Sequence, residues 1–210
     1  MSAFELNAPL MKQPTETPQP NYVVPLRVSQ STAMQIATDF LQEGKSKTRL
    51  LLLCGALFEI VAFQRGMRAR VDRGNTPKRC GFRPHVFDLE CIDEDGKVVT
   101  AVEIKKRALT LADVQETITK SRCREIQEVF FTAPRITPAD AEKIKSRLST
   151  AISAGQSFYV FDFFSLARAV LALGGNAMRR LFLQKVGDHL DTWATQPSHR
   201  QAWKRLLESL

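Results

Sequence analysis

The pattern of apolar and polar residues becomes regular near position 30 and has a helical period over two segments. It predicts a helix over residues 31–43, ended by Gly44, and a second over 48–64, ended by Gly66. The second segment is apolar on nearly every side, so we expect it to be buried. Residues 1–28 contain five prolines, which exclude helix and central strand, and an extended arm is expected there.

Two later segments alternate between apolar and polar residues, which is typical of half-buried strands. They span residues 85–92 and 97–105 and are joined by Asp93-Glu-Asp-Gly96. Asp-Gly favours a tight hairpin, so we expect a two-residue turn at these last two positions. Counting outward from that turn predicts the apolar pairs Leu89 with Val102 and Phe87 with Ile104.

The remaining pattern alternates strands with helices. Short strands are predicted over 128–132 and 157–161. Helices are predicted over 110–125, from the Thr137-Pro138 start, and over 163–173, 176–190 and 198–209. The strand–helix–strand order between 97 and 132 implies a parallel crossover, so the class is α/β, with a mixed sheet flanked by helices. We divide the chain into the arm (1–28), a core (29–162) and a C-terminal helical extension (163–210).

The predicted hairpin brings two carboxylates together. Asp88 lies opposite Glu103, and like charges in directly opposed positions destabilise a sheet. A divalent cation between them would remove that cost, and hard oxygen ligands suit Mg²⁺ or Mn²⁺. Lys105 lies on the same side, two residues beyond Glu103. Two carboxylates, a metal and an ammonium suit phosphodiester hydrolysis. The alternative is an exposed hairpin whose charges are solvated.

At these residues the chain resembles the PD-(D/E)xK nuclease superfamily, through Asp88 and Glu103-Ile-Lys105 in adjacent strands. The proline of that motif is displaced, since Pro84 lies four residues before Asp88. The chain is most similar to type II restriction endonucleases of the SacI kind, through the apolar helix with Glu59, the basic stretch before Asp88 and the segment 158–166. The resemblance implies a restriction-endonuclease-like core, Mg²⁺-dependent cleavage of double-stranded DNA and a homodimer.

Three further residues are candidates for the site. The resemblance implies that Glu59 joins the metal ligands, although it could instead face water or pair with an arginine. Glu90 shares a side with Asp88 and could be a third ligand or support one. Gln115, near the start of the helix after Lys105, corresponds to a polar position that faces the site in nucleases of this type; a solvated residue is the alternative.

Charge points to the same class of partner. The chain carries 30 Lys and Arg against 22 Asp and Glu, a net charge of +8 that favours nucleic acid. Residues 65–85, rich in glycine and proline, read as a basic loop that contacts the DNA backbone, with Lys106 adding charge beside the site. The candidate DNA-binding residues are Arg68, Arg70, Arg73, Lys78, Arg79, Arg83 and Lys106.

Other classes of function are less well supported. The longest apolar run, 50–58, is too short to cross a bilayer, and we expect no membrane association. Four widely spaced cysteines lack zinc-site spacing and suggest a reducing cytoplasm. The sequence therefore predicts a metal-dependent endodeoxyribonuclease of type II. The alternatives are a junction-resolving, repair or defence nuclease of the same fold, or a DNA-binding module without catalysis.

Overall fold

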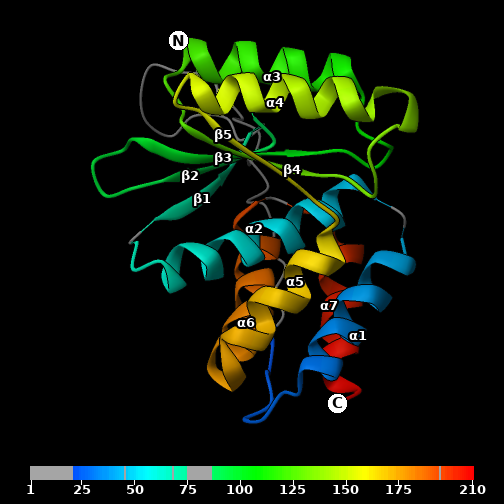
Figure 1. Ribbon diagram of the computed structural model, residues 1–210. Helices are drawn as coiled ribbons and strands as arrows, with labels where there is room; N and C mark the ends of the chain where they lie inside the picture. Colours follow the sequence, from blue (N-terminus) through cyan, green and yellow to red (C-terminus); the bar gives the residue numbers. More distant parts are fainter. Residues whose placement is uncertain (1–20, 45, 68, 75–86, 194) are drawn as a thin grey trace, which may run out of the picture.

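A five-stranded sheet lies between two layers of helices (Figure 1). The computed structural model describes residues 21–44, 46–67, 69–74, 87–193 and 195–210. Its strands are β1 (Arg70–Arg73), β2 (Leu89–Ile92), β3 (Val98–Ile104), β4 (Glu128–Thr132) and β5 (Ser157–Phe161). Its helices are α1 (Gln30–Gln42), α2 (Lys47–Gln64), α3 (Leu111–Cys123), α4 (Ala141–Ser153, after a 3₁₀ turn at Pro138–Asp140), α5 (Phe163–Leu173), α6 (Gly175–Thr192) and α7 (Pro197–Glu208). The predicted α/β class with a mixed sheet and flanking helices is confirmed.

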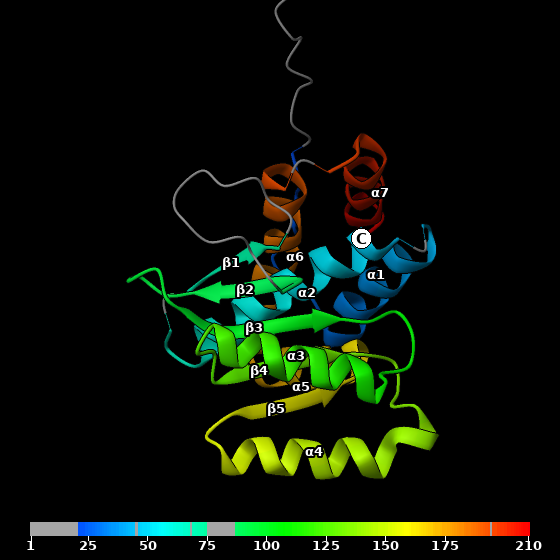
Figure 2. The ribbon, with the colours of Figure 1, turned by 90° about the horizontal axis from the view of Figure 1, so that it is seen from above.

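The sheet has the order β1-β2-β3-β4-β5, and β2 runs opposite to the other four strands, as Figure 2 shows from above. The first three strands pair antiparallel, whereas β3–β4 and β4–β5 pair parallel. Parallel neighbours need a crossover connection, and α3 and α4 provide the two crossovers. The crossover predicted between residues 97 and 132 is therefore confirmed.

The predicted basic loop contains a strand that the sequence pattern did not predict. Arg70–Arg73 forms β1 and pairs with all four residues of β2. Within it, Val71 is buried against the helices, while the charged residues beside it keep contact with solvent. Val71 is the one apolar residue of this strand, so the sequence shows no clear alternation of apolar and polar residues there, and its charges predicted a loop. The prediction of a loop is wrong over these four residues, and residues 75–86 lie outside the described part of the chain.

The hairpin turn differs from the prediction by one residue. The Gly96 N–H donates to the Asp93 carbonyl (3.1 Å) and the Asp93 N–H donates to the Lys97 carbonyl (3.0 Å), so the loop has three residues rather than two. Gly96 adopts φ 78°, which glycine favours and which this kind of loop requires. An irregularity between Cys91 and Ile92 then shifts the register by one residue. Beyond it the register matches the prediction.

The pairing of β2 with β3 stops at Leu89. Asp88 turns out of the ladder, and its Oδ2 accepts the Ile104 N–H at 2.8 Å. A side-chain carboxylate thus takes the place of the backbone carbonyl that a continuing strand would supply. Phe87 is buried in the cluster on the α3 side of the sheet, whereas Ile104 belongs to the opposite cluster. The predicted ladder pairs of Phe87 with Ile104 and Asp88 with Glu103 are therefore wrong.

Two hydrophobic clusters lie on opposite faces of the sheet. The larger one is formed by α1, α2, α5, α6, α7 and the residues of β1 to β4 that face them, and the smaller one by α3 and α4 with the other face. Helix α2 runs through the larger cluster, as expected from its apolar sequence. Trp203 of α7 is fully buried there, edge-to-face with Phe40 of α1 at 5.0 Å. No helix in the described ranges has the length and apolar character to cross a membrane.

The described end of the proline-rich arm lies along α6. The Val28 N–H donates to the Asn176 side chain (2.8 Å), and Arg179 donates to the Val28 carbonyl at the same distance. Arg180 similarly donates to the Pro25 carbonyl at 3.0 Å. This adjacent pair of arginines therefore contacts the backbone of the arm.

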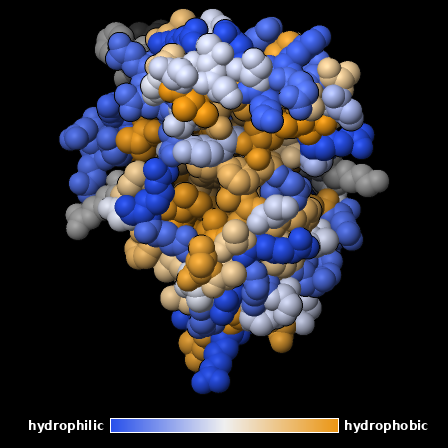
Figure 3. Space-filling model, in the orientation of Figure 1, coloured by the Kyte–Doolittle hydropathy of each residue, from blue (hydrophilic) through white to orange (hydrophobic). Residues whose placement is uncertain are grey.

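The edge strand β5 carries part of an exposed apolar area. Apolar side chains gather across the middle of the face seen in Figure 1, below α3 and α4 (Figure 3). Tyr159 of β5 is 40% exposed, and its ring lies 4.8 Å from that of Phe130 and 6.3 Å from that of Phe161. These aromatic rings extend the larger cluster toward the surface rather than forming a separate site.

Candidate active site

Asp88 lies where β2 and β3 separate. One of its carboxylate oxygens, Oδ2, accepts the Ile104 N–H, which restricts rotation of the side chain. The other oxygen, Oδ1, lies 2.6 Å from Nζ of Lys47, the first residue of α2. The side chain is 18% exposed, so its carboxylate is accessible at one side only. Asp88 is thus held by a strand backbone and by a helix on the larger-cluster side of the sheet.

Glu103 is buried on the other face of β3, under α3. Its residue is 4% exposed, and two ammonium groups approach its two oxygens. Lys105 Nζ lies 3.4 Å from Oε2, and Lys120 Nζ lies 3.6 Å from Oε1. Lys120 is in turn held by Glu116, 2.7 Å away and one helical turn earlier in α3. The structure therefore places Lys105 and Glu103 on one side of the sheet, as the alternation predicts.

The environment of Glu103 disfavours its negative charge. Burial raises the pKa of this carboxyl, and the charge of Asp88 adds to the increase, while Lys105 and Lys120 oppose it. Asp88 thus influences the pKa of Glu103, although Asp88 contacts Lys47 of α2 and Glu103 contacts Lys120 of α3 on the other side of the sheet.

Asp113 completes the polar group around Lys105. It is the third residue of α3 and forms a capping box with Thr110. Both of its oxygens accept hydrogen bonds from Arg107, at 2.7 and 2.8 Å, and Lys105 Nζ lies 3.6 Å away. Burial raises the pKa of Asp113, but the hydrogen bonds from Arg107 and Thr110 outweigh it and hold that pKa well below its usual range. Asp113 therefore stays ionised and anchors Lys105 from the helix side.

The depressed pKa of Asp113 makes its contribution to stability depend on pH. We expect Asp113→Ala to lower the free energy of unfolding by about 1 kcal/mol at pH 7, the usual cost of losing a helix cap. A carboxyl whose pKa is lowered in the folded state stabilises the fold at pH values above its pKa in the unfolded chain, 3.8. This stabilisation is lost as the pH falls toward the lower pKa of the folded state. Urea unfolding at pH 7 and pH 3 should show a smaller difference between variant and parent at pH 3. An equal difference at both pH values would contradict the assignment.

The structure does not bring Glu59 to Asp88 and Glu103. Its carboxylate contacts Lys185 Nζ at 3.0 Å and lies 3.5 Å from His189 Nε2, both on α6. Burial raises the pKa of Glu59, and burial likewise lowers that of His189 to about 3. The carboxylate is directed toward a neighbouring helix because α2 packs on α6 along this side. Glu59 therefore belongs to the helical core in this structure.

The two other candidates differ in burial. Glu90 is 2% exposed and pairs with Ala101, so it lies on the same side of the sheet as Glu103; its Oε2 is 3.9 Å from Arg124. Glu90 therefore faces α3 together with Glu103, whereas Asp88 contacts Lys47 of α2, so the predicted shared side of Glu90 and Asp88 is wrong. Gln115 is exposed on α3, and its backbone carbonyl accepts a hydrogen bond from Thr119. Its placement favours the solvated alternative.

The candidate DNA-binding residues are only partly within the described residues. The Arg70 side chain is 67% exposed and contacts Asp72 at 3.1 Å, while Arg73 donates to the Trp193 carbonyl at 3.5 Å. Lys106 is exposed directly after Lys105. Arg68, Lys78, Arg79 and Arg83 lie outside the described residues. Three of the seven can therefore be placed, on β1 and at the end of β3.

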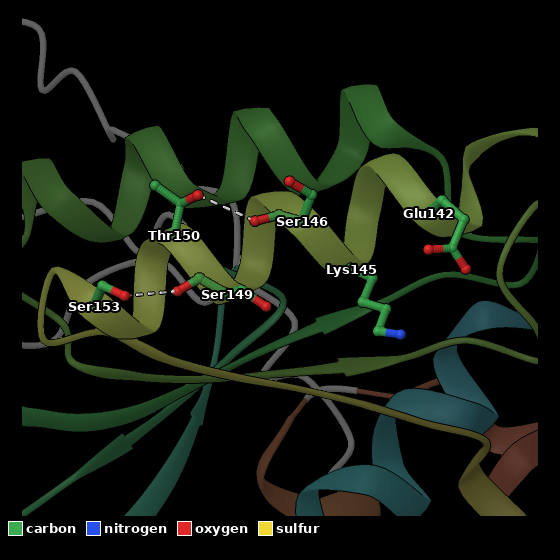
Figure 4. A pocket seen from close by; sticks show the side chains of 6 residues that line it. All are labelled: Glu142, Lys145, Ser146, Ser149, Thr150 and Ser153. Atoms are coloured by element: carbon green, nitrogen blue, oxygen red, sulfur yellow. Dashed lines mark hydrogen bonds between the residues drawn. The ribbon is translucent and has the colours of Figure 1, made fainter.

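A surface pocket on α4 has no connection with these groups. It is lined by Glu142, Lys145, Ser146, Ser149, Thr150 and Ser153, all on the exposed side of that helix (Figure 4). Thr150 and Ser153 donate to backbone carbonyls one turn earlier, at 3.1 and 3.2 Å. The hydroxyls therefore serve the helix itself, and the pocket lacks a group of acidic ligands.

Two lysines of the site were missed by sequence reasoning. Lys120 has a detectable signal, because it follows Asp113 and Thr117 at helical spacing and so shares their buried side of α3. Lys47 has none, since it precedes the apolar part of α2 and is far from Asp88 in sequence. Its contact depends on how α2 lies against the sheet.

The donor set suits a hard divalent cation. The described residues contain no group of three or more His, Cys, Asp or Glu side chains arranged to hold a metal. Mg²⁺, however, commonly uses only one or two protein carboxylates together with water and substrate phosphate. Asp88 Oδ1 and the Glu103 carboxylate are oxygen donors of the kind that such an ion prefers, and the charge of Asp88 raises the pKa of Glu103.

Comparison with known proteins supports a nuclease fold. No curated protein matches the sequence. Residues 27–134, just over half of the chain, match the family described as the SacI restriction endonuclease C-terminal domain. The matched region includes α1 to β4, and with them Asp88, Glu103 and Lys105. The chain belongs to the SacI restriction endonuclease C-terminal domain family.

Proposed function

We propose that this restriction-endonuclease-like protein is a Mg²⁺-dependent type II endonuclease of the PD-(D/E)xK superfamily that hydrolyses phosphodiester bonds in double-stranded DNA. Family membership supports the class of reaction. The observation that supports the assignment of residues is the group of charged side chains where β2 and β3 separate, at the end of the hairpin away from its turn. There the buried Glu103 carboxylate has Lys105 at 3.4 Å and lies within the electrostatic influence of Asp88.

The carboxylates would hold the metal through Asp88 Oδ1 and Glu103, with Mg²⁺ or Mn²⁺ as the ion. When bound, such an ion polarises a phosphoryl oxygen and lowers the pKa of a coordinated water. The bond from the Ile104 N–H to Asp88 Oδ2 fixes the direction in which Oδ1 points. Such preorganisation matters because an ångström of displacement in a catalytic group can cost about a hundredfold in rate.

Lys105 is the proposed catalytic ammonium. Its position between Glu103 and Asp113 places a positive charge at the border of the buried site, with 22% of the side chain exposed. From there it can orient the attacking water or stabilise charge that develops on the phosphate. Lys120 and Arg107 hold the two acidic partners of Lys105 and so fix its surroundings.

DNA binding is proposed to use the basic surface beside this site. Lys106 is exposed next to Lys105, Arg70 is exposed at the turn end of the sheet opposite Ile92, and the net charge of +8 favours a polyanion. A symmetric homodimer would place two such sites on the two strands of a duplex. A cytoplasmic location remains an expectation from cysteine usage.

The function is tested by digestion of DNA with the purified protein. We expect linear products with discrete lengths from a long duplex in Mg²⁺, and no products when EDTA replaces the metal. Sequencing the product ends would give the site and the overhang. Cleavage confined to branched substrates would instead favour a junction-resolving nuclease, and binding without nicking would favour the non-catalytic module.

A further inference from the structure

Lys47 forms an ion pair with Asp88 in the described part of the chain, and sequence analysis gave it no role. It is the first residue of α2, directly after the Ser46 cap whose hydroxyl accepts the Thr48 N–H. Its Nζ lies 2.6 Å from Asp88 Oδ1, while Oδ2 is engaged by the Ile104 N–H. The ammonium therefore occupies the oxygen that the proposed function assigns to the metal.

An ammonium and a divalent cation repel each other strongly when both contact one carboxylate oxygen. They would therefore compete for Oδ1. The other two lysines of the site are differently placed, because each is shared between two carboxylates: Lys105 between Glu103 and Asp113, and Lys120 between Glu103 and Glu116. Among the described residues Lys47 has Asp88 as its one ion-pair partner, and its side chain is half exposed.

We propose that Lys47 is a resident cation that the divalent metal displaces from Asp88, and that the released ammonium contacts the phosphate of the bound DNA. This inference rests on the proposed function. The second part of the proposal, the contact with phosphate, follows from the position of Lys47. A lysine within 2.6 Å of a metal ligand remains beside the metal after release. The phosphate that the metal polarises would then be an anion within its reach. Lys47 would thus stabilise Asp88 before binding and the substrate afterwards.

The first test is titration of the full chain with Mn²⁺ alone, in the absence of DNA, by calorimetry. We expect Lys47→Met and Lys47→Gln to bind Mn²⁺ roughly two- to fivefold more tightly than the parent, since a half-exposed ion pair contributes little. Lys145→Met is the matched control, because it removes the same charge from the exposed side of α4. It should leave the affinity unchanged. Unchanged or weaker Mn²⁺ binding by both Lys47 variants would overturn the competition.

The same titration separates this inference from the proposed function. If Asp88→Asn binds Mn²⁺ as well as the parent does, or if the parent binds none, the assignment of the metal to Asp88 is wrong. If Asp88→Asn loses binding while both Lys47 variants match the parent, the metal site stands and the role of Lys47 is wrong.

The second test measures the salt dependence of binding to a short duplex of mixed sequence, with Ca²⁺ present and with EDTA. Each phosphate contact by a lysine contributes about one to the slope of log K against log salt concentration. We expect the slope for Lys47→Met to be smaller than that of the parent by about one in Ca²⁺ and equal to it in EDTA. The Lys145→Met slope should equal the parent in both. Equal slopes for Lys47→Met and parent in Ca²⁺ would overturn the phosphate contact.

Discussion

Asp88→Asn and Glu103→Gln should each reduce DNA cleavage by on the order of 10³-fold. Both replacements keep the shape of the side chain and remove the charge that would hold a divalent cation. Metal ions contribute several kcal/mol to stabilisation of phosphoryl-transfer charge, and each 1.36 kcal/mol is tenfold in rate. DNA binding should survive in both variants, because phosphate contacts by Lys and Arg supply most of the affinity.

Initial rates of plasmid linearisation in Mg²⁺ would measure the cleavage, and a filter-binding or anisotropy assay in Ca²⁺ would measure the binding. Glu142→Gln is the matched control, since Glu142 is an exposed carboxylate on α4 that lines the surface pocket of that helix. It should cut like the parent. Cleavage at the parental rate by either site variant would remove that residue from the active site.

Trp203→Ala should lower the free energy of unfolding by about 3–5 kcal/mol, the usual cost of deleting a large buried aromatic side chain. Trp203 is fully buried, and its ring meets Phe40 edge-to-face at 5.0 Å. It connects the last helix of the chain to the first. A loss of this size is a large fraction of the stability of an ordinary domain.

Urea unfolding followed by far-ultraviolet circular dichroism would measure this loss. Leu210→Ala is a suitable comparison, because Leu210 follows α7 and is 52% exposed, and it should change stability by less than about 0.5 kcal/mol. A similarly small effect of Trp203→Ala would show that α7 does not contribute to the core as the structure indicates.

The position of α7 is relevant to the division of the chain into arm, core and C-terminal extension that was made from the sequence. Residues 163–210 were expected to be an extension to a nuclease core, and their boundaries remain a prediction. In the structure α5, α6 and α7 share one hydrophobic cluster with α1 and α2. Helix α2 in turn supplies Lys47 to Asp88. Loss of packing in the helical layer would therefore disturb the site through α2.

Local chemistry was sufficient to predict most elements and the grouping of Glu103 with Lys105. Side chains two residues apart on a strand share a side whatever surrounds the strand, so alternation predicted this pair directly. The strands at 128–132 and 157–161 were also predicted with the observed bounds. Each is a short apolar run next to a predicted helix, which is again a local feature of the sequence. The register near Leu89 and Val102 was also predicted correctly, although from a turn one residue too short.

Tertiary structure decided the features that depend on distant backbone or on a neighbouring helix. The charged residues of β1 predict a loop by themselves, and only pairing with β2 makes Arg70–Arg73 a strand. Asp88 does not pair in the β2–β3 ladder, and its carboxylate accepts the Ile104 N–H instead. The alternation of apolar and polar residues does not predict this arrangement. Glu59 and Lys47 both lie on α2, yet packing against α6 and the sheet directs one to Lys185 and the other to Asp88. Side-chain alternation is a property of one strand, whereas the partners of a buried charge are set by the helices that enclose it.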